Sequence, residues 1–238
     1  MVAQRELGAA FDSAIAYVAT IAALVALTSV FMNEFFLAGK LDMRPLFDLL
    51  PLLFVLYAPA LSMRSWSEDL RTRTFELWMT LPLSPAAVVA GKYLANLALL
   101  GLFLVGTLPV VALLVSLGEP DLGRIAAGYA GAFALGATFL ALGAWCSALT
   151  ADQIVAFLGA AFGAFVLVFL GEERVVAVLD GAAPGWRIGS FLCDHLSALP
   201  PYESFVRGSL SLGACAWFGG LTLLFLALTT LAVQRNRT

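Results

Sequence analysis

One internal stretch, residues 64–92, is rich in residues that could do chemistry and reads RSWSEDLRTRTFELWMTLPLSPAAVVAGK. A polar segment of that length cannot lie in hydrocarbon, so it suits contact with a soluble partner at a membrane face. Its Gly91-Lys92 pair does not make a phosphate-binding loop. That motif needs a glycine where Ala86 stands and a Ser or Thr where Tyr93 stands. The stretch therefore predicts a docking segment without a nucleotide site.

The chain has a single histidine, His195, which follows Cys193 and Asp194. These three residues are the other candidates for a metal site or for nucleophilic catalysis. Three adjacent residues are poorly placed to surround one metal ion, and the cysteines show no CxxC or Cys/His zinc spacing. No serine or cysteine of the apolar stretches has a histidine available as a base. We expect no enzyme activity, metal or cofactor in this chain, and a membrane enzyme or an ion-independent channel is the weakest alternative.

The composition places the chain in a membrane. Of its residues 61% are hydrophobic and 12% are charged, and the mean hydropathy is +0.94. Soluble domains carry about 25% charged residues, so the excess apolar surface must face a lipid bilayer. The formal net charge of −3, without a Lys/Arg-rich tail, gives no reason to expect nucleic acid as a partner.

The apolar stretches predict an all-α, polytopic membrane protein. A span needs about 20 apolar residues, because the hydrocarbon core is about 30 Å thick. We expect a single transmembrane domain over residues 1–238 with six spans, at about 14–36, 45–63, 93–117, 125–149, 154–170 and 210–233. Pro51 and Pro59 fall in the second span and Pro109 in the third, so both helices should be kinked.

An even number of spans puts both termini on one side, and a small excess of Arg and Lys on that side predicts that it is cytoplasmic. Residues 2–12 are expected to form a short interfacial helix before the first span. On the other face, Leu192, His195 and Leu196 recur at helical spacing and predict short external helices before the last span. The pair Pro200-Pro201 is expected to stop that helix.

The polar stretch itself predicts a helix over Ser65–Met79, with charged residues outward and apolar residues packed on the bundle or a partner. Pro82 and Pro85 should end it, and the chain should re-enter the membrane after Lys92. A rigidly docked helix between two spans could transmit force from a soluble protein. A solvated loop without a special role is the alternative.

The order of residues in this stretch resembles the first cytoplasmic loop of type-2 ATP-binding-cassette (ABC) transporter permeases. The matching elements are Glu68-Asp69, Arg71, Thr74, Glu76-Leu77, Leu81-Pro82-Leu83-Ser84 and Gly91-Lys92. Arg73 departs from the pattern, because the family usually has glycine there. Ser147–Phe157 is similar to the family's turn between spans four and five. Pro200–Leu212 and the N-terminal RELGAAFDSAIAYV resemble the permeases of gliding motility and nitrous-oxide-reductase maturation.

The resemblance implies a permease subunit of an ATP-driven transporter, located in the bacterial inner membrane. Two copies of a separate ABC ATPase would hold the ATP and Mg, and a second permease chain, identical or different, would complete the pore. A membrane-anchored protein with a large external domain is a further possible partner. Small external loops favour export or extraction of a membrane-borne substrate, and a non-transporting scaffold or assembly factor is the alternative function.

The resemblance also assigns roles to particular residues. It implies an ATPase-coupling helix, a second cytoplasmic turn and a connecting helix at the N-terminus. Their residues are, for the coupling helix, Glu68, Asp69, Arg71, Thr74, Glu76 and Leu77; for the turn, Thr150, Asp152 and Gln153; and for the connecting helix, Arg5 and Glu6.

Overall fold

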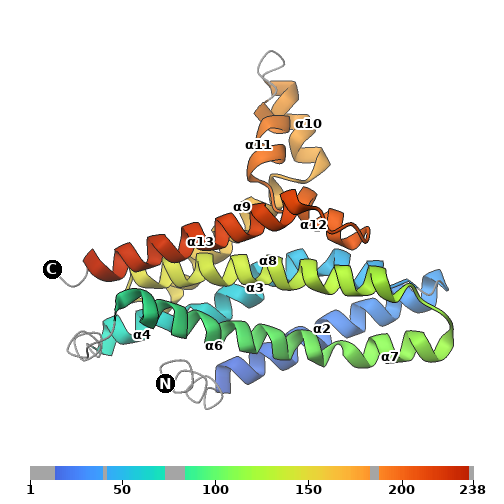
Figure 1. Cartoon of the computed structure of the whole chain (residues 1–238), viewed down its shortest axis with the longest axis horizontal. Helices are drawn as coiled ribbons and strands as arrows, with labels where there is room; N and C mark the ends of the chain where they lie inside the picture. Colours follow the sequence, from blue (N-terminus) through green and yellow to red (C-terminus); the bar gives the residue numbers. More distant parts are fainter. Residues whose placement is uncertain (1–13, 40–41, 73–83, 183–187, 236–238) are drawn as a thin grey trace.

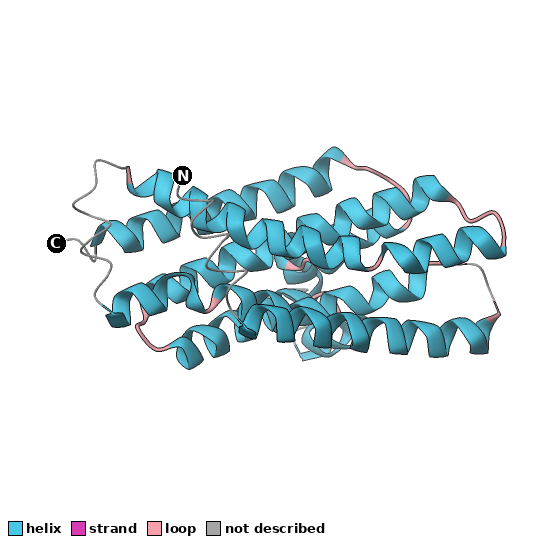
Figure 2. Cartoon of the chain, turned by 90° about the horizontal axis from the view of Figure 1, so that it is seen from below, coloured by secondary structure: helices cyan, strands magenta, loops and turns pink. Residues whose placement is uncertain are grey.

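The computed structural model describes residues 14–39, 42–72, 84–182 and 188–235, which form helices joined by short turns without any strand among them (Figures 1 and 2). The expected all-α, polytopic membrane fold is confirmed. The interfacial helix predicted at residues 2–12 lies outside the described residues, as does the part of the polar stretch after Thr72 and before Ser84.

Within the described residues, five helical stretches are long and apolar enough to cross a membrane. They are α2 (Ala14–Ala38), α3 (Arg44–Ser62) continued by α4 (Arg64–Thr72), α6 (Pro85–Gly106) with α7 (Leu108–Leu117), α8 (Leu122–Leu149), and α13 (Leu212–Arg235). The fifth predicted span, at about 154–170, corresponds to α9 (Gln153–Phe169), which is shorter. A 78° bend separates it from α10 (Glu173–Ala182).

The third span begins earlier than its apolar run. Ser84 is the N-cap of α6, its hydroxyl accepts a hydrogen bond from the Ala87 N–H at 3.3 Å, and Pro85 occupies the first turn. The point after Lys92, where the chain was expected to re-enter the membrane, therefore lies inside a helix that has already begun, because a Ser-Pro pair is a helix start signal. The same span is interrupted at Thr107, close to Pro109 where a kink was expected.

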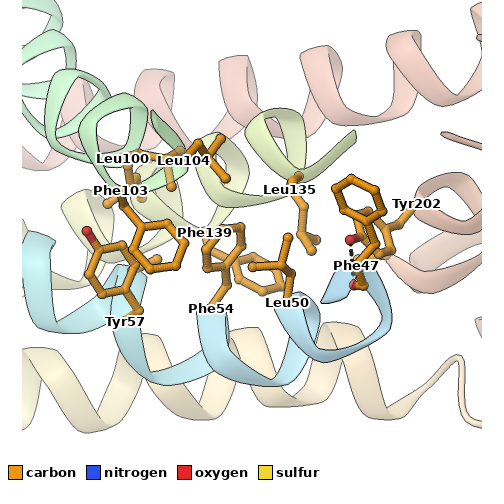
Figure 3. Close-up of a cluster of buried hydrophobic side chains, with 14 of the residues drawn as sticks. Phe47, Leu50, Phe54, Tyr57, Leu100, Phe103, Leu104, Leu135, Phe139 and Tyr202 are labelled. Atoms are coloured by element: carbon orange, nitrogen blue, oxygen red, sulfur yellow. Dashed lines mark hydrogen bonds between the residues drawn. The ribbon is translucent and has the colours of Figure 1, made fainter. Parts of the chain in front are cut away.

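Helix α8 forms the centre of the bundle because its small residues let neighbouring helices approach closely. A Cβ atom at Gly136 would lie 2.8 Å from the Leu100 side chain, and one at Gly128 would lie 2.5 Å from Phe47. Aromatic rings fill the space beside α8 (Figure 3). Among them, Phe54 and Phe103 meet edge to face, with ring centroids 5.8 Å apart.

Among the described residues, three short helices lie between α9 and α13. Helices α10 and α11 (Ile188–Leu196) project away from the bundle (Figure 1), and the Asp180 carboxylate accepts a hydrogen bond from the Ser190 N–H at 3.1 Å. Short helices precede the last span, as predicted. The prolines at 200 and 201, however, do not stop a helix. They occupy the first turn of α12 (Leu199–Val206), where a missing N–H costs nothing.

Candidate coupling surface at the end of the bundle

Helix α4 lies at one end of the bundle, the end at which α13 finishes (Figure 1). Its inner face is buried: the Trp66 side chain is 1% exposed and packs in a cluster with Val88 and Val89 of α6, Ala148 of α8 and Val233 of α13. A nine-residue helix is too short to persist alone in water, so this packing is what holds α4 in shape.

The outer face of α4 is charged and open to solvent. Arg71 and Thr72 are exposed, and the Glu68 side chain is 42% exposed. Glu68 Oε2 lies 3.3 Å from Arg64 Nε, an i,i+4 pair that supports the helix by a few tenths of a kcal/mol. Two residues of the predicted ATPase-coupling set, Glu68 and Arg71, therefore present charge outward from a firmly packed helix.

Asp69, a third member of that set, points the other way. Its side chain is 17% exposed, and its Oδ2 lies 2.8 Å from the Nζ of Lys92 on α6. The two charges compensate each other within the protein, so Asp69 here fastens α4 to the third span.

Lys92 is the centre of this attachment, and its side chain is only 5% exposed. Its Nζ also donates a hydrogen bond to the Ser65 carbonyl at 2.7 Å and lies 5.1 Å from the centre of the Trp66 ring. One turn further along α6, Asn96 Nδ2 donates to Ser65 Oγ at 2.8 Å. A buried ammonium group needs such partners, because desolvation alone would cost several kcal/mol.

Sequence reasoning placed Lys92 in the polar segment and missed its role as a buried anchor. The Ser84-Pro85 start signal could have located it two turns inside a helix. Nothing in the local sequence indicates that its partners are Ser65 and Asp69, because that depends on how α4 packs against α6.

The second predicted cytoplasmic turn lies beside α4, which packs against α8 and α9. Asp152 is the N-cap of α9: its Oδ1 accepts hydrogen bonds from Ile154 N at 2.8 Å and from Val155 N at 3.4 Å. Thr150 Oγ1 accepts from Asp152 N at 3.1 Å, and Gln153 is half-buried. The structure thus brings Thr150, Asp152 and Gln153 to the same end as α4, with Asp152 exposed.

Other predicted site residues fall outside the described residues. They are Thr74, Glu76 and Leu77 of the coupling set and Arg5 and Glu6 of the connecting helix. His195 is described, and its ring stacks on Phe191 with centroids 4.4 Å apart. No group of three metal-binding side chains comes together within the described part of the chain.

The described parts of α4 and the turn after α8 form one surface with a charged outer side and a buried, hydrogen-bonded inner side. Such a surface is suited to receive a soluble protein and pass its movement to the spans. A family model described as ABC-2 family transporter protein matches residues 7–233, which includes both elements. No curated protein matches the chain.

Proposed function

The chain belongs to the ABC-2 transporter family, and we propose that this membrane permease subunit is coupled to a separate ABC ATPase through its 64–80 loop. Permeases of this family pair with an ABC ATPase subunit. The proposal adds that two ATPase copies dock from the cytoplasm, hold the ATP and Mg, and act on α4 and the Thr150–Gln153 turn.

This proposal rests on the contrast between the two faces of α4, one attached to the bundle and the other charged and turned outward. Its inner face is fastened to α6 through Lys92 and Asp69, while Glu68 and Arg71 face outward at the end of the bundle. A ligand or partner can bias a conformational equilibrium only through contacts that differ between the states. A partner that binds this outward face differently with and without ATP would therefore move the spans attached behind it.

The proposed function also includes a class of substrate and a set of partner chains. The described external part consists of short helices, which offer little surface for a soluble binding protein, so the transported substrate is membrane-borne and is exported or extracted. A second permease chain, identical or different, completes the pathway in the bacterial inner membrane, with both termini in the cytoplasm. A membrane-anchored protein with a large external domain is the accessory partner that this arrangement would accommodate.

Purification of the intact complex tests this function. We expect an ABC ATPase to co-purify with the permease, and its ATP hydrolysis in lipid to rise when the permease is present. Mass spectrometry of the complex identifies the chains and any bound lipids. Recovery of the permease in a stable complex without an ATPase would favour a scaffold or assembly factor.

Reversing the outward charges of α4 should weaken ATPase binding without unfolding the permease. In the double variant Glu68→Lys/Arg71→Glu, the affinity for the ATPase is expected to fall about tenfold, equivalent to about 1.4 kcal/mol. Titration of ATPase into permease in lipid nanodiscs, with hydrolysis as the readout, measures this change. Surface substitutions of this kind alter stability by about 0.5 kcal/mol or less.

The matched control reverses one acidic and one basic exposed residue at the opposite end of the bundle, the i,i+4 ion pair of Glu203 and Arg207, in the variant Glu203→Lys/Arg207→Glu. Its ATPase affinity should equal that of the wild type. Equal losses in both variants, or none in the α4 variant, would contradict docking on α4.

Cysteine labelling should verify the orientation. In a variant with Cys146 and Cys215 replaced by alanine, an impermeant maleimide added outside should label Cys193 on α11. In a cysteine-free background carrying Arg71→Cys, labelling should require permeabilised membranes. The proposed topology would be refuted if, from outside, the Arg71→Cys variant were labelled and Cys193 were not.

The pH dependence of this labelling follows from the surroundings of Cys193. Burial, with Asp194 and Glu203 nearby, raises the pKa of the Cys193 thiol above its usual 9.0. A raised pKa leaves less thiolate at neutral pH, and the thiolate is the reactive form. Labelling of Cys193 should therefore be slower at pH 7 than for an ordinary exposed cysteine and accelerate as the pH rises.

A further inference from the structure

A hydroxyl group from the fourth span is inserted where α3 passes into α4. Ser147 Oγ of α8 donates a hydrogen bond to the Met63 carbonyl at 2.9 Å and accepts one from the Ser67 N–H at 3.0 Å. In an uninterrupted α-helix the Ser67 N–H would donate directly to the Met63 carbonyl. Ser147 thus bridges the two backbone groups that the helix ladder would otherwise join.

The bridge uses the full hydrogen-bonding capacity of a serine hydroxyl, which is one donor and two acceptor positions. The second acceptor position takes the Trp66 N–H at 3.0 Å. Ser147 is fully buried, and the residue before α4, Met63, has a side chain that cannot cap a helix. The cap of α4 is therefore supplied from 80 residues away in the sequence.

A glycine on α8 lets the end of α3 lie close to α8 beside the Ser147 bridge. Gly143 lies one turn before Ser147 on α8, and a Cβ atom there would lie 1.9 Å from Ser62 Oγ. The absent side chain lets the last residue of α3 lie directly against α8. A side chain that inserts into the helix ladder is a known cause of helix kinks.

We propose that Ser147 is a positioning residue for transport, which sets the direction of α4 relative to α3 and transmits the movement of α4 to the fourth span. This inference rests on the proposed coupling function. With the Ser147 bridge in place, α4 is attached at its start to α8 and, through Ser65 and Asp69, to Lys92 of α6. A displacement of α4 is then passed to the third and fourth spans as well as along α3.

The test follows the outer end of α8 in the permease–ATPase complex. Spin labels at Phe36→Cys on α2 and Leu122→Cys on α8 occupy exposed positions, in a background without the native cysteines. In the wild-type sequence, ATP with vanadate should shift the distance between the labels. In Ser147→Ala this shift should be lost, while ATPase binding is retained.

Two further variants separate the hydroxyl group from packing. Ser147→Thr keeps the hydroxyl and should keep the shift; if its extra methyl group prevents folding, Ser147→Cys takes its place and should give a smaller shift than the wild type. The matched control is Thr229→Val, because Thr229 is equally buried and its hydroxyl donates to Phe225 within its own helix. This control should behave as the wild type.

The outcomes distinguish the inference from the function on which it rests. If the wild-type complex shows no ATPase stimulation and no shift, the coupling function itself fails. If the wild type shifts and Ser147→Ala shifts equally, or if Ser147→Thr folds and loses the shift as alanine does, the positioning role of the Ser147 hydroxyl is overturned.

Discussion

Replacing Lys92 by methionine is expected to destabilise the protein by about 3 kcal/mol, because it leaves the largely buried Asp69 carboxylate without its counter-charge. The change also removes the hydrogen bond to the Ser65 carbonyl and the cation over the Trp66 ring. Thermal unfolding in detergent should show the loss as a fall in Tm on the order of 6 °C or more. ATPase stimulation should fall with it, because α4 loses its attachment to the third span.

The double variant Lys92→Met/Asp69→Asn is the informative comparison. Removing the negative charge as well should recover most of the lost stability, since the cost comes from an uncompensated charge more than from the lost attraction. A second control, Arg207→Met, breaks an exposed ion pair and should cost less than about 1 kcal/mol. If Lys92→Met and the double variant were equally unstable, the pair would matter only through packing.

Adding one methyl group at Gly143 is expected to have the second largest effect. In Gly143→Ala the new Cβ would lie 1.9 Å from Ser62 Oγ and 2.9 Å from Ser62 Cβ, so α3 must move away from α8. Overpacking of this kind costs about 1–3 kcal/mol. The displacement should also pull the α3–α4 junction away from Ser147. We therefore expect a lower Tm together with weaker ATPase stimulation.

Gly101→Ala is the matched control, because a Cβ atom at Gly101 of α6 would meet nothing within 4 Å. Alanine favours the helix by up to about 1 kcal/mol over glycine, so this variant should be as stable as the wild type or more so. A second test relieves the clash: Ser62→Gly combined with Gly143→Ala should regain stability. Failure of that combination to recover any Tm would show that the contact with Ser62 is not the cause.

The sequence determined the class of the molecule and the number of its apolar stretches, because hydropathy over about 20 residues is a local property set by the thickness of the bilayer. It also located the polar segment between the second and third spans, where α4 lies, and it indicated the family through the order of residues there. At Ser84-Pro85 a local start signal marks the beginning of α6, which lies before the apolar run from which the third span was predicted.

Only the tertiary structure decided which side of α4 each residue occupies. Glu68 and Asp69 are adjacent carboxylates that the sequence treats alike, yet Glu68 faces outward and Asp69 is held by Lys92. Ser147 gives no local sign that it caps a helix 80 residues earlier. The reason is physical: a hydrogen bond or ion pair between distant segments depends on how the helices pack, and packing is a property of the whole fold.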